Sequence, residues 1–138
     1  MDVLVPHRPD PFALLFLGAG MGHFSQREMM TGYVASKGVP AARLMVPLSG
    51  AVILVGGLMA AVGVWPDLGA LLLVAFLVPT AVLMHGFWRE TDTASKANEQ
   101  TQFLKDLSLA GAALALFAFF ASAGDELGLV VLGPLFTL

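Results

Sequence analysis

Three long apolar runs constrain this chain more than any other feature of its sequence. They cover residues 41–64, 66–88 and 103–124. A helix rises 1.5 Å per residue, so about 22 residues extend roughly 33 Å and cross a bilayer core of about 30 Å. Spanning β-strands would instead alternate polar and apolar residues over about ten positions, whereas these runs are continuous and rich in Ala and Leu. The runs therefore predict membrane-spanning α-helices.

The composition of the chain supports a protein embedded in lipid. Of its 138 residues, 57% are hydrophobic and 12% are charged, and the mean hydropathy is +0.82. A soluble domain has about 25% charged residues, and a short chain buries too little surface to hide so many apolar groups. The net charge of -3 argues against a nucleic-acid partner, and the lack of cysteine excludes disulfides, thiol nucleophiles and cysteine-ligated metals. We predict a single-domain, all-α integral membrane four-helix bundle.

The first apolar segment is ambiguous because it is short. It begins at residue 11 and stays apolar for about 14 residues, fewer than the roughly 20 that a span needs, before GAGMGHFSQREMM turns polar. Either the polar residues mark the water boundary, with Arg27 extending to the headgroups, or the helix continues inside the membrane. We predict one helix over residues 11–33. His23 and Arg27, four residues apart, then share a face toward the other helices, because an ionisable group in lipid needs a partner.

The cationic residues indicate how the chain crosses the membrane. The first and third connections, with their flanks, hold Arg27, Lys37, Arg43, Arg89, Lys96 and Lys105, whereas Arg8 alone lies on the other side. Cytoplasmic connections carry an excess of Lys and Arg. We therefore place both long connections in the cytoplasm and both termini outside, in a prokaryotic plasma membrane. The third connection, RETDTASKANEQTQ, is expected to be a polar loop, and the apolar stretch after residue 124 is too short to cross.

Small residues and prolines mark where the helices are expected to pack or bend. The small residues are Gly18 and Gly22 in the first span, Gly50, Gly56 and Gly57 in the second, and Gly111, Ala115, Ala118 and Ser122 in the fourth. Such residues let helix backbones approach closely in lipid. Pro47 and Pro79 each leave one carbonyl without its helical partner.

All four predicted spans bring polar or aromatic side chains to the same membrane face. The candidate residues for a polar pocket or quinone site are His23, Arg27, Glu28, His85, Phe87, Trp88 and Asp106. A quinone site needs a histidine or an acid to hydrogen-bond a carbonyl oxygen, an aromatic wall and access from lipid, and HGFW with Asp106 supplies these groups. The alternative interpretation of HGFW is an aromatic belt at the membrane interface. A bis-histidine haem is disfavoured, since nothing directs the two rings toward each other. We assign no catalytic residue and no metal ligand, and we expect a protein that is not catalytic on its own.

Three stretches, GVPAARLMVPLSGAVILVGGLMAAVG, HGFWRETD and NEQTQFLKDLSLAGAALALF, resemble the DoxX family of small four-span membrane proteins. The resemblance covers about residues 12–122. It implies a compact four-helix bundle and a link to membrane redox chemistry. Family members resemble the membrane subunit of a thiosulfate:quinone oxidoreductase, and others act with thiol-oxidant defence enzymes. His85, Phe87 and Trp88 match the family pattern.

The chain departs from that pattern at three positions. It has His23 where the family often has a lysine, Ile53 where a glutamate often precedes the paired glycines, and Asp106 where an asparagine often opens the fourth span. Loss of the carboxylate at position 53 argues against any proton or quinone chemistry that the family shares through it.

The sequence favours a DoxX-like accessory or quinone-interacting subunit of a membrane redox assembly. Two alternatives stay open. One is a membrane scaffold or assembly factor without small-molecule chemistry, and the other is a small carrier for an apolar or weakly acidic solute. The expected partners are the lipid bilayer and either another membrane-associated redox protein or a second copy of this chain.

Overall fold

In a computed structural model of the chain, residues 11–123 and 130–138 are described. Nearly all of the first range is helical, which confirms the all-α fold class. The elements are α1 (Pro11–Ser25), α2 (Arg27–Ser36), α3 (Ala42–Val62), α4 (Pro66–Met84), the 3-10 helix η1 (Phe87–Arg89) and α5 (Thr93–Ala123). Three segments are long and apolar enough to cross a membrane: α3, α4 together with η1, and α5.

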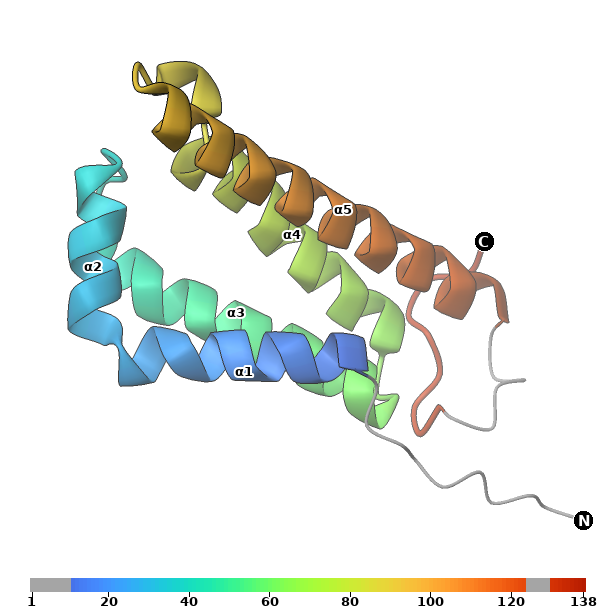
Figure 1. The fold of residues 1–138 in the computed structure, drawn as a ribbon. Coiled ribbons are helices and arrows are strands. Elements are labelled where there is room, and N and C mark those ends of the chain that lie inside the picture. Colours follow the sequence, from blue (N-terminus) through green and yellow to red (C-terminus); the bar gives the residue numbers. More distant parts are fainter. Residues whose placement is uncertain (1–10, 124–129) are drawn as a thin grey trace, which may run out of the picture.

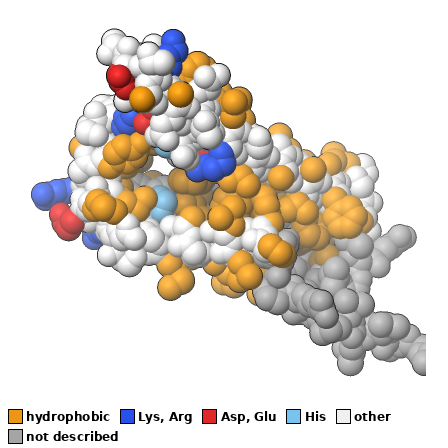
Figure 2. Space-filling view, viewed as in Figure 1, with side chains coloured by type: hydrophobic (Ala, Val, Ile, Leu, Met, Phe, Trp, Pro, Cys, Tyr) orange, Lys and Arg blue, Asp and Glu red, His pale blue; other side chains and the backbone are white. Residues whose placement is uncertain are grey.

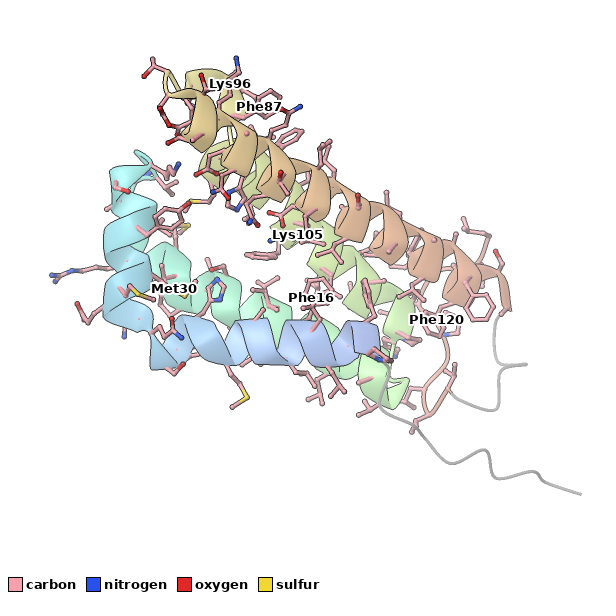
Figure 3. The ribbon with its side chains drawn as sticks, in the orientation of Figure 1. Phe16, Met30, Phe87, Lys96, Lys105 and Phe120 are labelled. Carbon is pink, nitrogen blue, oxygen red and sulfur yellow. The ribbon has the colours of Figure 1, made fainter. Side chains whose placement is uncertain are left out.

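The helices pack as two pairs that meet along one central contact. Helix α1 lies along α3, α5 lies along α4, and α3 packs on α4 to join the pairs (Figure 1). Residues from all four helices form the shared core, and Phe16 points from α1 toward the α4–α5 pair (Figure 3). The core residues are Phe16, Ile53, Leu73, Leu77, Ala110 and Ala113.

Helix α2 leaves the direction of α1 and stands beside the first turns of α3 (Figure 1). The stretch predicted as one helix over residues 11–33 is therefore divided into two helices by a break at Gln26. Hydrogen bonds still cross this break, since the Gln26 N–H donates to the Gly22 carbonyl at 2.9 Å and the Met30 N–H donates to the Gln26 carbonyl at 3.0 Å. The chain thus remains helical past Phe24 but changes direction.

The third connection is much shorter than the sequence suggested. The polar stretch from residue 93 to residue 102 forms the first turns of α5, so the prediction of a long polar loop is wrong there. The Ser95 N–H donates to the Asp92 carboxylate at 2.9 Å, which satisfies one of the free donors at the start of the helix. Residues 85–92, called the elbow below, are all that separates α4 from α5.

Glycines set the closest helix approaches, but not all of those that the sequence indicated. A Cβ on Gly69 would lie 2.8 Å from the carbonyl oxygen of Gly56, so α3 and α4 touch through their backbones. Gly20 plays the corresponding part between α1 and α3, where it is buried against Gly50. The predicted packing pair of Gly18 and Gly22 is wrong, because nothing lies within 4 Å of a Cβ at either position. In α5 the stripe of Gly111, Ala115, Ala118 and Ser122 is likewise exposed.

At the end of the bundle opposite the elbow, the chain's last described residues fold back onto the α3–α4 turn. The Trp65 N–H donates to the Leu132 carbonyl at 3.2 Å, and the Phe136 N–H donates to the buried Asp67 carboxylate at 2.7 Å. The final apolar stretch therefore closes the turn from residue 130 onward. Arg8 and the start of that stretch at residues 124–129 lie outside the described residues.

Hydrophobic side chains cover the flanks of the bundle. Figure 2 shows them along much of the visible face, with charged side chains gathered toward the end that carries α2 and the elbow. Large apolar residues such as Leu44, Leu58 and Phe119 are more than half exposed. Such a surface fits a hydrocarbon environment rather than water.

Candidate functional site

A cavity of about 450 Å³ opens between α1, α2, α3 and α4, near the elbow. Its walls are mostly apolar, and Val46, Val52 and Phe76 are typical of them. Figure 2 shows a histidine in a hollow among hydrophobic side chains on this face. Five side chains bring polar atoms to the lining: His23, Tyr33, Ser49, Thr80 and His85. A space of this size lies within the range of small-molecule sites, which are usually apolar with a few placed polar groups.

His85 follows the last turn of α4 and lies between two carboxylates of α5. Its Nδ1 is 2.7 Å from Oε2 of Glu99, and its Nε2 is 3.7 Å from Oδ2 of Asp106. The three side chains are only 15%, 11% and 7% exposed, respectively. Glu99 and Asp106 are seven residues apart, two helical turns, so they share one face of α5. The imidazole is thus fixed in orientation at the boundary between the cavity and the charged cluster.

Lys37 completes a polar cluster, defined here as Lys37, His85, Glu90, Glu99 and Asp106. Its Nζ is 2.9 Å from Glu99 Oε1 and 3.3 Å from Glu90 Oε1. The hydrogen bond to Glu99 raises the pKa of the Lys37 ammonium above its ordinary value. Because Lys37 follows the last residue of α2, this contact ties α2 to the elbow and to α5 beside the cavity.

The aromatic residues of HGFW lie beside the cluster rather than on the cavity wall. The rings of Phe87 and Trp88 are 5.3 Å apart between centroids, and Phe103 of α5 lies 5.5 Å and 5.6 Å from them, respectively. Phe87 is beside the first turns of α5 (Figure 3). The cavity lining includes neither Phe87 nor Trp88, and the rings that α4 and the elbow bring to it are Phe76 and the imidazole of His85. The trio instead packs the elbow onto α5.

The remaining predicted site residues separate into two groups. His23 lines the cavity, and its Nδ1 is 2.9 Å from the Ala19 carbonyl. Arg27 and Glu28 are exposed and lie outside the cavity. Arg27 donates a hydrogen bond of 3.2 Å to the Arg43 carbonyl, and Glu28 has no ion pair with any described residue. The structure therefore brings His85 and Asp106 together, sets His23 on the same cavity and leaves Arg27 and Glu28 on the outside.

Sequence reasoning missed Lys37 and Glu99. The sequence places Glu99 in a polar loop, although its spacing of seven residues from Asp106 puts the two on one helical face once residues 93–102 are helical. No comparable signal marked Lys37, since its partners are more than 50 residues away in the sequence. Within residues 11–123 and 130–138, no three His, Asp or Glu side chains are arranged to hold a metal ion.

The fold and surface together define an integral membrane protein built from apolar helices. Comparison with protein families then identifies the family of this membrane protein. The DoxX family model matches residues 11–86, which is more than half of the chain. The chain therefore belongs to the DoxX family. The match confirms the family resemblance found in the sequence. No curated protein and no solved structure matches the chain. The matched range includes all of the cavity lining and ends before Glu99 and Asp106.

Proposed function

We propose that this protein binds a lipid-soluble ligand of the quinone and hydroquinone class in the cavity, as an accessory subunit of a membrane redox assembly. The observation that carries the proposal is the cavity itself, an apolar space of about 450 Å³ with one histidine from α1 and one from the elbow on its wall. An apolar body would pack against Val46, Val52 and Phe76, while polar oxygens would meet the few polar atoms of the lining.

Access to the cavity supports a ligand that arrives from the bilayer. Leu48 and Leu83 contribute to the lining, yet they are 51% and 45% exposed. The wall at these residues therefore faces lipid on one side and the cavity on the other. A hydrophobic molecule dissolved in the membrane would reach the site without crossing water.

The distribution of cations supports placing the cavity end in the cytoplasm. Lys37, Arg43, Arg89 and Lys96 all belong to the connections near the elbow or to the adjoining helix ends. An excess of Lys and Arg is typical of cytoplasmic connections. Reactivity of a cysteine introduced at Lys96 toward a membrane-impermeant reagent, in intact cells and in inverted vesicles, would test this orientation.

A binding titration tests the proposed ligand class. Purified protein in mild detergent would be titrated with a decyl-substituted benzoquinone and with its hydroquinone, while extracts of the purified protein are examined for bound lipid-soluble cofactors. Val52→Phe fills part of the cavity and should weaken binding about tenfold or more. Ala51→Phe is the matched control, since Ala51 is the exposed neighbour outside the lining. Failure of both redox forms to bind would remove the proposal.

The exposed small residues of α5 favour a second candidate function as a membrane scaffold. Gly111 has nothing within 4 Å of its Cβ position, and the stripe that it shares with Ala115, Ala118 and Ser122 faces away from the bundle. Small stripes let a second helix approach closely in lipid. Cross-linking in native membranes and pull-down in mild detergent test this function, with Gly111→Leu expected to abolish the association. A protein that runs alone as a monomer would contradict it.

A further inference from the structure

His23 presents a hydrogen-bond acceptor to the cavity. Its Nδ1 lies 2.9 Å from the Ala19 main-chain carbonyl. A carbonyl only accepts, so Nδ1 carries the hydrogen and donates it. None of the described carboxylates lies within ion-pair distance of His23, and the Phe76 ring is its aromatic neighbour at 5.9 Å. A neutral imidazole that carries its hydrogen on Nδ1 is an acceptor at Nε2. Nε2 then keeps its lone pair, and it has no hydrogen bond to any described residue.

The two aliphatic hydroxyl groups of the cavity wall are acceptors as well. Ser49 donates its hydrogen to the Val46 carbonyl at 2.9 Å, and Thr80 donates its hydrogen to the Phe76 carbonyl at 2.7 Å. Each hydroxyl has a single hydrogen, so only the oxygen lone pairs remain for a ligand. Both residues therefore offer the cavity the same chemistry as His23.

The other two polar side chains of the lining are turned toward carboxylates. Both ring nitrogens of His85 face acidic groups, Glu99 at 2.7 Å and Asp106 at 3.7 Å. Burial, followed by the negative charge of Glu99, raises the pKa of the Tyr33 phenol. The hydrogens of His23, Ser49 and Thr80 are thus directed to main-chain carbonyls, and His85 is held by Glu99.

From these contacts we infer that the cavity selects a ligand that carries O–H donors: a phenol, or the hydroquinone form of a quinone pair. This inference rests on the proposed function and names the redox form that the site binds. A hydroquinone hydroxyl can donate to His23 Nε2, to Ser49 Oγ or to Thr80 Oγ1. A quinone offers only carbonyl acceptors, which would face lone pairs and leave polar atoms of both partners unsatisfied.

Three matched ligands test the inference on the full-length protein in mild detergent, under nitrogen and at pH 8. They are a decyl-substituted benzohydroquinone, its quinone, and its dimethyl ether, which keeps the ring but lacks both donors. We expect the hydroquinone to bind about tenfold more tightly than either of the others, the effect of roughly one hydrogen bond. Equal or tighter binding of the quinone or the ether would overturn the inference while leaving the proposed function intact. If none of the three binds, the proposed function itself fails.

Substitutions of His23 and Thr80 test whether these acceptors cause the preference for the hydroquinone. His23→Leu and the isosteric Thr80→Val should each weaken hydroquinone binding with little change for the quinone, whereas His23→Gln keeps an acceptor oxygen and should retain part of the preference. Met21→Leu is the control on the same helix, since Met21 is 65% exposed and outside the lining. Unchanged discrimination in both His23→Leu and Thr80→Val, with melting temperatures close to that of the unaltered protein, would contradict the assignment.

Discussion

The guanidinium of Arg27 donates a hydrogen bond of 3.2 Å to the main-chain carbonyl of Arg43. Residue 43 lies four positions before Pro47, so its carbonyl is the one that the missing proline N–H leaves without a helical partner. A side chain from α2 thus repairs a defect in the first turns of α3. The contact explains how the exposed Arg27 side chain is used without belonging to the cavity.

A double-mutant cycle tests this relationship. Arg27→Ala should lower the free energy of unfolding in detergent by about 1 kcal/mol. In a Pro47→Ala background the cost should fall close to zero, because the main-chain N–H that the substitution restores can donate to the same carbonyl. Glu28→Ala is the control, since Glu28 is exposed and has no ion pair with any described residue. Equal costs of Arg27→Ala in the two backgrounds would show that the hydrogen bond does not compensate for the proline.

Removal of the imidazole between the two carboxylates of α5 should be strongly destabilising. His85→Ala leaves the buried Glu99 and Asp106, two helical turns apart on α5, without the imidazole that lies between them. We expect a loss of about 3 kcal/mol, measured by thermal or denaturant unfolding in detergent. In a Glu99→Gln background the loss should be smaller, because one of the two charges is already gone. A His85→Ala protein as stable as the original would mean that the cluster contributes nothing to the fold.

Alkaline pH should loosen the contact between α2 and the elbow. The pKa of Lys37 is raised above its ordinary 10.5, first by the hydrogen bond to Glu99, and the pKa of Tyr33 is raised above 10.0, first by burial. A group whose pKa is higher in the folded state stabilises the fold below its unfolded value and loses that contribution as pH rises through its folded value. The melting temperature should therefore fall as pH rises beyond about 10.5.

Lys37→Met isolates the lysine contribution to this pH dependence. The variant should melt at a lower temperature than the original protein at pH 8, by an amount equivalent to about 1–2 kcal/mol, and should show a flatter decline at alkaline pH. Faster hydrogen exchange of α2 amides should accompany the loss. Lys96→Met, at an exposed position of α5 without an ion pair to any described residue, should leave both measurements unchanged. If the melting temperature of Lys37→Met falls at alkaline pH as steeply as that of the original protein, groups other than Lys37 cause the decline.

The close approach of α3 and α4 makes Gly69 intolerant of a side chain. Gly69→Ala places a Cβ 2.8 Å from the Gly56 carbonyl oxygen, so the backbones must separate. We expect a loss of about 2–3 kcal/mol in unfolding experiments. Gly111→Ala makes the same chemical change where nothing lies within 4 Å, and it should be neutral or stabilising by up to about 1 kcal/mol. If the two substitutions have equal effects, the contact is not a tight one.

The sequence predicted the fold better than the site because apolar length is a local property. Runs of more than 20 apolar residues can only be satisfied as spanning helices, and α3, α4 and α5 follow from them. The sequence does not reveal Glu99 as a buried helical residue, because the polar first turns of α5 have no apolar period. Its burial depends on Lys37 and His85, which no nearby residue predicts.

The wrong prediction of which glycines in α1 pack against another helix has a different origin. Gly18 and Gly22 share one face of α1 and Gly20 lies on the opposite face, so only the rotation of the helix decides which face meets α3. An almost uniformly apolar helix in lipid carries no pattern that fixes this rotation. Gly20 could therefore be recognised only from its contact with Gly50. The predicted cavity residues differ in the same way, since His23 turns inward and Arg27, beyond the break at Gln26, does not.

The two ends of the bundle are held by different forces. At the α3–α4 turn, the Trp65 N–H donates to the Leu132 carbonyl and the Phe136 N–H donates to the Asp67 carboxylate, which is buried and so little affected by dissolved salt. At the elbow, ammonium and carboxylate groups hold α2 in place, and dissolved salt weakens such attractions where water reaches them. Motion that separates the helix pairs should therefore begin at the cavity, with the opposite turn serving as its hinge.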